Sequence, residues 1–279
     1  MPELPEVETV RRGLAKRLVG RTFSRISVNR PDLRFPIPKD LAHRLTGRPI
    51  EAIDRRAKFL LMRFGGGDVL IGHLGMSGRM ILDEGGRPKE VHDHLVFEID
   101  DGGRLIYNDT RRFGFVDLAR QDRLESHPRL AGLGPEPLSP AFNAAYFRKK
   151  LAGRMSPIKA VLLDQKTVSG IGNIYACEAL YQAGISPRRM AASVGAGRAA
   201  TLVDEVKDVL SRAIEAGGSS LRDYVQADGE LGYFQHAWKV YGREGQGCSG
   251  APGDKICRAS IRRIVQSGRS TFYCHRCQR

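Results

Sequence analysis

The residues at the start of the chain are suited to nucleophilic catalysis. Removal of the initiator methionine, which is usual before a small residue, would leave Pro2 as a free secondary amine close to two carboxylates, Glu3 and Glu6. An α-amino group titrates near pH ~8 and a lysine near ~10.4, so far more of the former is unprotonated at neutral pH. A secondary amine that attacks a sugar carbon gives an iminium ion, which is a good electron sink. The alternative is that Pro2 and Pro5 only stiffen the leader of a helix.

Four cysteines near the end of the chain have the spacing of a metal site. Cys274 and Cys277 form a C-x2-C pair, preceded by Cys257 and Cys248. Four thiolates in a tetrahedral arrangement bind structural zinc and stabilise the fold directly. The first pair is unusual because eight residues separate its members, and Asp254, in the position of a C-x2-C ligand, is the alternative fourth ligand.

The composition favours a globular protein with an anionic partner. The 279 residues carry 45 Lys or Arg against 31 Asp or Glu, a net charge of +14, and 41% of residues are hydrophobic. From residue 243 to 279 there are eight basic residues and two acidic ones. This excess of positive charge favours binding to nucleic acid or to an acidic membrane surface. No run approaches the ~18 apolar residues of a membrane span, and no apolar signal core is present, so we expect no membrane association and a cytoplasmic location.

The first half of the chain reads as one helix followed by many short strands. Residues 3–19 have apolar residues at helical spacing, and Gly20 is a good helix stop. Short apolar runs then alternate with glycine-rich turns, which is the pattern of a β-sandwich or barrel: 59–62, 69–74, 95–99, 105–107 and 113–118.

The second half reads as helical, with a small terminal module. Residues 133–140 are a candidate linker, 157–185 form two helices around a glycine-containing turn, and 204–216 form an amphipathic helix. Cys177 lies in one of these helices as a buried side chain. The segment from residue 242 onward is too poor in apolar residues to fold without a metal or a disulfide.

A glycine-containing turn at 169–175 could bind phosphate. It reads Ser-Gly-Ile-Gly-Asn-Ile-Tyr, so we expect Asn173 as the N-cap of a helix whose free N–H groups face an anion. Lys159 and Lys166 lie nearby in the sequence. The alternative is an ordinary tight turn between packed helices.

These pieces together resemble the bacterial formamidopyrimidine-DNA glycosylases. The motifs that carry the resemblance run through the whole chain in the family's order: Pro-Glu-Leu-Pro-Glu-Val-Glu-Thr at the start, Arg-Arg-Ala-Lys58, His-Leu-Gly-Met76-Ser-Gly, Arg111-Arg-Phe113-Gly, Gly-Ile-Gly-Asn173-Ile-Tyr-Ala and Arg269-Ser-Thr-Phe-Tyr-Cys-x-x-Cys.

The resemblance implies an α+β protein in three parts: a β-sandwich with a leading helix over 1–132, a helix-two-turn-helix module over 133–241 and a β-hairpin zinc finger over 242–279. It implies a monomeric base-excision repair enzyme that binds duplex DNA, removes oxidised purines such as 8-oxoguanine and formamidopyrimidines, and nicks the strand. It implies one structural zinc ion held by Cys248, Cys257, Cys274 and Cys277, and neither a redox cofactor nor a catalytic metal.

The resemblance also assigns roles to residues. Pro2 is the nucleophile, Glu3 the acid that protonates the sugar, Lys58 a proton donor or phosphate clamp, and Arg269 a contact to the phosphates beside the lesion. The expected DNA contacts are His92, Arg111, Arg154, Asn173, Met76 and Phe113; of these, Met76, Arg111 and Phe113 fill the gap left by the extruded nucleotide. Arg154 stands where the family commonly has lysine, so its geometry toward phosphate differs. Residues 217–232 are the expected loop over the extruded base.

Less specific interpretations remain for these residues. Met76 and Phe113 could be core residues, and Lys58 an exposed lysine at the start of a strand. At the level of function, the alternatives are a zinc-finger protein that only binds DNA and a glycosylase-like scaffold that has lost its chemistry. The first leaves the leader unexplained, and intact Pro2, Glu3, Lys58 and Arg269 argue against the second.

Overall fold

The computed structural model describes residues 2–219, 234–250 and 257–279. The chain divides into two compact units, one made of Met1–Ala131 with Ala216–Tyr233 and the other of Gly132–Glu215 with Phe234–Arg279. The finer division of the second unit at residue 242 stays a prediction.

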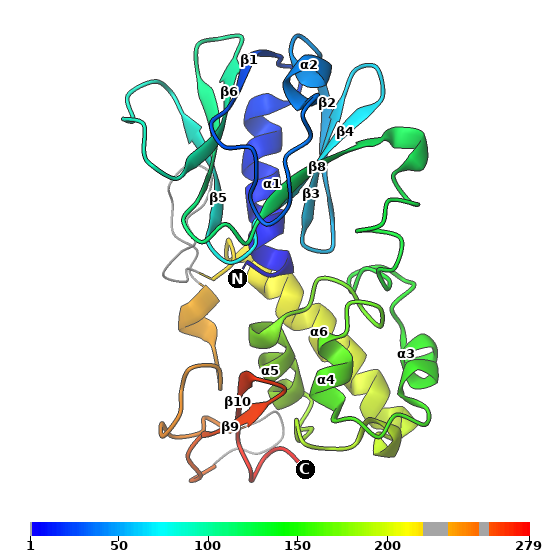
Figure 1. Ribbon diagram of the computed structural model, residues 1–279. Helices are drawn as coiled ribbons and strands as arrows, with labels where there is room; N and C mark the ends of the chain where they lie inside the picture. The colour runs from blue at the N-terminus through cyan, green and yellow to red at the C-terminus, as the bar shows by residue number, and fades with distance from the viewer. Residues whose placement is uncertain (1, 220–233, 251–256) are drawn as a thin grey trace. The chain divides into compact units, whose positions relative to one another are not determined.

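The leading helix of the first unit forms where the sequence predicts it. Helix α1 covers Leu4–Leu18, with Glu3 as its N-cap and Val19 as its C-cap. Its apolar stripe is buried. Basic residues in its last turn interact favourably with the negative end of the helix dipole and so stabilise the helix. The helix lies along strands β2 and β3 (Figure 1).

Two antiparallel four-stranded sheets make up the rest of this unit, as the sequence predicts. One sheet has the order β1-β6-β7-β5 and the other β2-β3-β4-β8. The strands are β1 (Phe23–Val28), β2 (Ile50–Arg56), β3 (Phe59–Phe64), β4 (Asp68–His73), β5 (Gly78–Asp83), β6 (Asp93–Ile99), β7 (Arg104–Asp109) and β8 (Phe115–Arg120). A short helix, α2 (Leu41–Leu45), and a 3-10 turn, η1 (Gln121–Arg123), complete the unit.

The core of the first unit lies between the sheets and α1. The ring of Phe23 on β1 contacts Phe97 of its own sheet at 4.9 Å between centroids and Phe64 of the other sheet at 5.9 Å. Burial of such large rings stabilises the sandwich by removing their apolar surface from water. The sandwich is therefore a stable platform from which the strand-connecting loops project.

Two of these loops cross at a pair of glycines. Gly75, in the β4–β5 loop, has φ +62°, and a Cβ on it would overlap the backbone of Phe113 and Gly114 in the β7–β8 loop. A Cβ on Gly114 would overlap the hydroxyl of Tyr107, which donates a hydrogen bond to the carbonyl of His73 (2.9 Å). Only glycine permits this approach, which keeps the two loops in contact.

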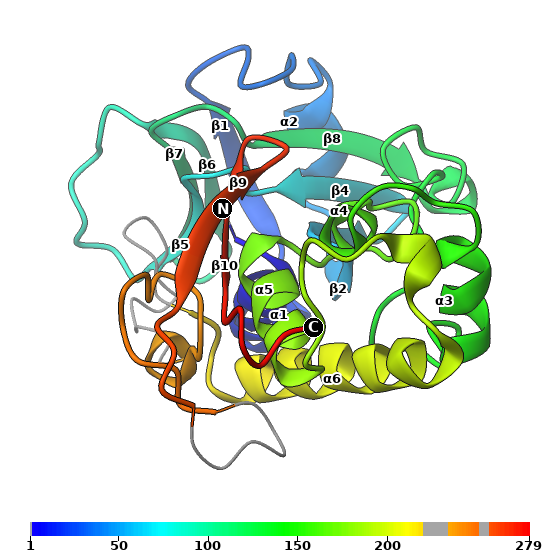
Figure 2. The ribbon, with the colours of Figure 1, turned by 90° about the horizontal axis from the view of Figure 1, so that it is seen from below.

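The second unit consists of helices and a hairpin. Its elements are α3 (Ala144–Leu151), α4 (Ile158–Leu163), α5 (Asn173–Gln182), η2 (Ala191–Ser193), α6 (Ala196–Glu215), η3 (Phe234–Ala237), β9 (Arg262–Gln266) and β10 (Arg269–Tyr273). Figure 2 shows α6 running along this unit, with α3 beside one end and α5 beside the other. Helix α6 starts eight residues earlier than the predicted 204–216, while α4 and α5 are the two helices expected within 157–185.

The terminal module shares its apolar core with helix α5. Cys177 and Tyr181 of α5 pack with Val240, Ile261 and the cysteines of the finger. The buried carboxylate of Glu178 accepts the backbone N–H groups of residues 239, 240 and 241 at 2.8–3.0 Å. Burial raises the pKa of Glu178, and these three hydrogen bonds act against that rise. The module is thus anchored on α5, which supplies apolar contacts that its own residues lack.

Among the described residues, no helix is long and apolar enough to cross a bilayer.

Replacement of Gly114 by alanine tests the crossing of the two loops. The added Cβ must displace Tyr107 or the His73 carbonyl, so we expect a loss of about 1–3 kcal/mol in the free energy of unfolding, measured by urea denaturation. The matched control is Gly86→Ala, because a Cβ at Gly86 meets no atom of the described part of the chain within 4 Å. Equal stability of the two variants would contradict the close approach.

Candidate active site and zinc centre

The first turn of α1 holds Pro2 next to two buried carboxylates. Glu3 and Glu6 form a capping box: Glu6 accepts the backbone N–H of Glu3 at 2.8 Å, and the Glu3 side chain faces the backbone N–H of Glu6. Glu3 is 3% exposed and Glu6 fully buried. Pro2, also buried, is therefore attached to a helix start whose backbone is fixed.

Glu6 also connects this turn to a distant segment of the first unit. Its other oxygen, Oε1, accepts the backbone N–H of Ser219 at 2.9 Å, and Gly218 approaches the Glu6 side chain with φ +77°. Residues 217–219 begin the loop expected over the extruded base, while residues 220–233 lie outside the described residues. One carboxylate thus hydrogen-bonds both to the leader and to the start of that loop.

Lys58 lies in a two-residue turn between β2 and β3. Arg56 pairs with Phe59, so Ala57 and Lys58 alone form the turn, and Ala57 has φ +53°. Arg55 stabilises this left-handed residue by donating to the Ala57 carbonyl at 2.8 Å while its Nε contacts Glu8 on α1 at 3.1 Å. Lys58 is 7% exposed. The alternative of an exposed lysine at a strand start is wrong.

His73 is a polar residue near Lys58 for which the sequence alone indicates no role. Burial, together with the positive charges of Lys58, Arg34 and Arg129, lowers the pKa of His73 to about 4. Its Nδ1 accepts the backbone N–H of Gly75 at 3.0 Å, so the neutral ring carries its proton on Nε2. The residue belongs to the His-Leu-Gly-Met motif, but only the spatial pairing of β3 with β4 places it beside Lys58.

The three residues expected to fill the gap in the duplex project from adjoining loops. Met76 follows the crossing at Gly75, and the N–H of Arg111 donates to Ser77 Oγ at 3.0 Å. The Arg111 guanidinium lies 4.9 Å from the ring centre of Phe113, whose side chain is 43% exposed. Phe113 is therefore not a core residue, and an exposed aromatic ring beside a cation suits contact with bases.

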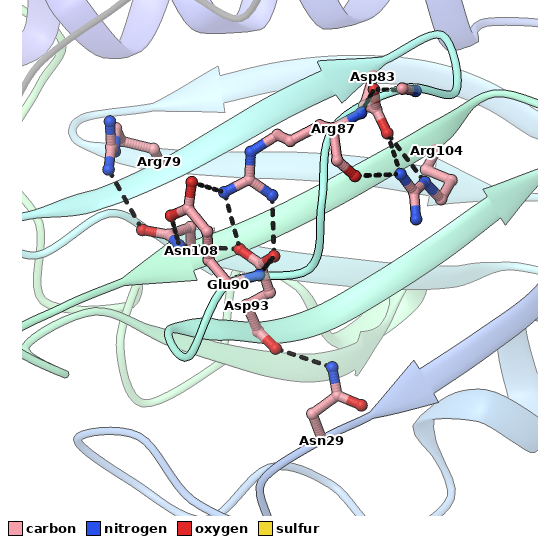
Figure 3. A network of polar contacts seen from close by, with 9 residues as sticks. Asn29, Arg79, Asp83, Arg87, Glu90, Asp93, Arg104 and Asn108 are labelled. Atoms are coloured by element: carbon pink, nitrogen blue, oxygen red, sulfur yellow. Dashed lines mark hydrogen bonds and ion pairs between the residues drawn. The ribbon is translucent and has the colours of Figure 1, made fainter.

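His92 lies at the end of a loop that two carboxylates hold. The loop, residues 84–92, connects β5 to β6. Figure 3 shows the network that fixes it, which consists of Asn29, Arg79, Asp83, Arg87, Glu90, Asp93, Arg104 and Asn108. Arg87 binds both oxygens of the buried Asp93 at 2.8 and 3.2 Å. Burial acts to raise the pKa of Asp83, but Arg104 and three backbone N–H groups outweigh it and lower that pKa to about 2. The loop is thus anchored at both ends, with His92 partly exposed.

The second unit holds Arg154, Asn173 and Arg269. Arg154 follows α3 and pairs with Asp164 at 3.2 Å, with both side chains partly exposed. Arg269 is exposed and directly follows the two-residue turn of the β9–β10 hairpin, in which Ser267 and Gly268 both have positive φ. That geometry is typical of the tight hairpin turns that fit the twist of two strands.

Asn173 differs from the sequence prediction. The N-cap of α5 is Gly172, and Asn173 is the first helical residue, because its side-chain amide reaches across to donate to the Ser270 carbonyl of β10 at 2.8 Å. Its Oδ1 is buried and has no hydrogen-bond partner among the described residues. Lys159, also fully buried, donates to Thr271 Oγ1 at 2.6 Å. Hydrogen bonds from Asn173 and Lys159 therefore connect the segment around the glycine-containing turn at 169–175 to the hairpin that carries Arg269. The sequence did not predict these contacts.

The four cysteines of the finger come together at metal-binding distance. Their sulfur atoms all lie within 4.8 Å of one another, with 3.7 Å between Cys248 and Cys277 and between Cys257 and Cys274. A tetrahedral zinc ion with bonds of ~2.3 Å separates its sulfur ligands by about 3.8 Å, so these residues fit one structural zinc. Asp254 lies outside the described residues, and the four thiols already complete a ligand set without it.

Comparison with known protein families gives matches to three domains in chain order. Residues 1–116 match the formamidopyrimidine-DNA glycosylase N-terminal domain, 133–225 the formamidopyrimidine-DNA glycosylase H2TH domain, and 255–279 the zinc finger found in FPG and IleRS. Among similar curated proteins, the formamidopyrimidine-DNA glycosylases of Cereibacter sphaeroides and Rhodospirillum centenum are 56% and 57% identical, with 100% of each chain covered.

Solved structures of similar proteins contain damaged DNA. A Lactococcus lactis FPG mutant in complex with a Fapy-dG containing DNA has a TM-score of 0.91 and 38% identity, and the Lactococcus lactis Fpg with an abasic site containing DNA has 0.90 and 38%. In both cases 100% of each chain is covered.

Glu6→Gln tests the bridging carboxylate. A glutamine side chain has one acceptor oxygen and one NH2 group in place of two acceptor oxygens. Either the backbone N–H of Glu3 or that of Ser219 therefore loses its acceptor and faces the NH2 group, which is itself a donor. We expect a loss of about 1–3 kcal/mol in the free energy of unfolding, measured by urea denaturation. Glu125→Gln, at an exposed position, is the control. A Glu6→Gln protein as stable as this control would rule out the bridge.

Zinc content tests the ligand set. The protein should contain one zinc ion per chain by elemental mass spectrometry, and Cys248→Ser should lose most of it. Cys177→Ala, at a buried cysteine outside the cluster, and Asp254→Asn should both keep it. Retention of zinc in Cys248→Ser with loss in Asp254→Asn would instead identify Asp254 as the fourth ligand.

Proposed function

This chain belongs to the formamidopyrimidine-DNA glycosylase family, and from that premise we propose that it removes oxidised purines, such as 8-oxoguanine and formamidopyrimidines, from duplex DNA and then cuts the strand. The family carries DNA glycosylase activity in base-excision repair together with AP lyase activity. Full-length similarity to enzymes of one name, with each motif in order, supports the assignment.

The proposed nucleophile is the imino nitrogen of Pro2 after removal of Met1. It attacks C1′ of the damaged nucleotide, the C1′–base bond breaks, and the base leaves with the proton that the attacking nitrogen gives up. The sugar ring then opens as its oxygen takes a proton from Glu3 and the nitrogen lone pair forms the double bond to C1′. The product is an iminium ion between Pro2 and C1′. The observation that carries this proposal is the capped first turn of α1, which attaches Pro2 directly to the buried Glu3 and leaves the nitrogen at the end of a fixed backbone. Such positioning lowers the entropic cost of attack.

The iminium ion then makes strand cleavage possible. It withdraws electrons from C2′, so loss of a C2′ proton expels the 3′-phosphate by β-elimination, and a second elimination expels the 5′-phosphate. We assign Lys58 to proton donation or to holding a phosphate, and Arg269 to the phosphates beside the lesion. The neutral Nε2–H of His73 near Lys58 offers a further donor to an anion. No step in this sequence needs an external oxidant or reductant.

Chemistry on a base requires the nucleotide to leave the stack, at a cost of a few kcal/mol. We assign Met76, Arg111 and Phe113 to the gap, with Arg111 hydrogen-bonding the orphaned base. Their projection from adjoining loops, two of them as an exposed cation–ring pair, supports this role. The phosphate contacts proposed for the backbone are His92, Arg154 and Asn173.

The zinc ion has a structural role in this scheme. The four cysteines of the finger would hold it, and its contribution is to stabilise the β9–β10 hairpin that presents Arg269. We further propose that the protein acts as a monomer in the cytoplasm, where its DNA substrate lies.

An N-terminal extension tests the nucleophile. A residue left ahead of Pro2 converts the amine to an amide, which cannot attack C1′, so strand cutting of an 8-oxoguanine duplex should fall by at least about a thousand-fold, measured under single-turnover conditions. Binding to the same duplex should change little. The control is the same extended protein after a protease has removed the extension and exposed Pro2, and it should regain full activity.

Undiminished cutting by the N-terminally extended protein would refute the assignment of Pro2. Binding without cutting by the unextended protein would instead favour the non-catalytic zinc-finger alternative.

A further inference from the structure

The second unit has a basic cavity that none of the assigned roles uses. It is an open cavity of about 520 Å³ between the turn that follows α5 and the base of the β9–β10 hairpin. The cationic side chains that line it are Arg188, Arg189, Arg262 and Arg279, and His275 lies beside them.

The charge of this cavity is not neutralised by neighbouring side chains. No acidic side chain is among those that line it, and within the described part of the chain none of its four arginines pairs with an Asp or Glu side chain, although Arg189 Nε contacts the main-chain oxygen of Arg279, the last residue. Other arginines of the protein behave differently, since Arg55, Arg87 and Arg104 each bind a carboxylate. Four like charges in one concavity repel one another and attract polyanions.

The backbone around the cavity is firmly held. The N–H of Arg279 donates to the Gly184 carbonyl at 3.0 Å, and the Arg279 carbonyl accepts the N–H of Ser186 at 3.3 Å. Arg189 Nε donates to the same carbonyl at 3.2 Å, which fixes the plane of its guanidinium. The Gln278 side chain donates to the Ile185 carbonyl at 2.9 Å. The arginines are thus presented by an ordered frame, which reduces the entropy lost when they bind an anion.

The same hairpin carries both this cavity and Arg269. Arg262 pairs with Tyr273 at the base of the hairpin, and Gln266 pairs with Arg269 at its tip. Four residues of strand separate the two ends, or roughly 13 Å at ~3.3 Å per residue. Gln266 Nε2 also donates to the Pro187 carbonyl, which ties the tip to the residue before Arg188 (3.2 Å). One rigid element therefore connects the cavity to a proposed phosphate contact.

We propose that this cavity binds backbone phosphates of the duplex outside the lesion, roughly 13 Å along the hairpin from the phosphate contact proposed for Arg269. The inference rests on the proposed function. Guanidinium groups bind phosphate oxygens in a bidentate manner, and such contacts carry no sequence information. The cavity adds affinity for any long duplex and takes no part in the chemistry. An acidic peptide is the competing occupant, but the continuity with Arg269 favours DNA.

The test compares Arg188→Gln/Arg262→Gln with a control of equal charge change, Arg25→Gln/Arg198→Gln, at exposed positions outside the cavity. Affinity is measured across a salt series for duplexes of about 12 and about 30 base pairs that contain a non-cleavable abasic analogue, and for undamaged duplexes of the same lengths.

For the long duplexes, the cavity variant should bind about ten-fold more weakly than the control variant, equally with and without the lesion. Its log–log salt slope should be shallower by about 1–2, since each lost phosphate contact removes ~0.9. With the short duplex this difference in affinity should shrink. Single-turnover cutting of a separate, cleavable 8-oxoguanine duplex at saturating enzyme should match that of the control variant.

Equal slopes for the two variants on long duplexes would overturn the proposal, and so would a slower chemical step in the cavity variant. Unchanged DNA affinity together with weaker binding of a poly-glutamate peptide would assign the cavity to an acidic partner. Failure of the unmodified protein to prefer the lesion-containing duplex would count against the proposed function itself and is distinct from these outcomes.

Discussion

The carboxylate of Glu6 is the interaction on which the candidate active site depends. Its two oxygens bind the backbone N–H of Glu3 in the leader and that of Ser219 at the far end of the first unit's sequence. A buried carboxylate is costly unless both oxygens are satisfied, so the start of α1 and the start of the 217–232 segment are held in one arrangement. Pro2 is covalently attached to this arrangement. The position of the proposed nucleophile therefore follows from a capping interaction rather than from the core of the sandwich.

The remaining site residues of the first unit come from turns, and the backbone of each turn explains the motif around it. Lys58 follows Ala57, whose left-handed backbone is held by Arg55; Met76 and Phe113 flank the crossing of two glycines. Gly75 adopts its positive φ without a side chain, whereas Ala57 needs the hydrogen bond from Arg55 to stay in this conformation. The sandwich behind the turns supplies the rigidity, and the ring of Phe23 between its sheets contributes to that.

Much of this could be predicted from the sequence, because period and spacing are local signals. Helix α1, five of the strands and the cysteine cluster follow from apolar spacing or ligand spacing. Strands β1, β2 and β5 were missed because charged residues such as Arg25, Asp54 and Arg79 interrupt their alternation. The Glu6–Ser219 contact joins residues 213 positions apart, and the amide of Asn173 is directed to a hairpin that begins almost ninety residues later. No local pattern encodes such contacts, and the site roles themselves rest on the family resemblance.

The central claim is that the imino nitrogen of Pro2 becomes bonded to deoxyribose during the reaction. The most direct test is to incubate the mature protein with a duplex that contains one 8-oxoguanine, reduce the mixture with borohydride, digest the trapped complex and map the modified residue by tandem mass spectrometry. The account predicts a sugar adduct on Pro2 and removal of Met1. An adduct on a lysine, or strand cutting by protein that retains Met1, would contradict it.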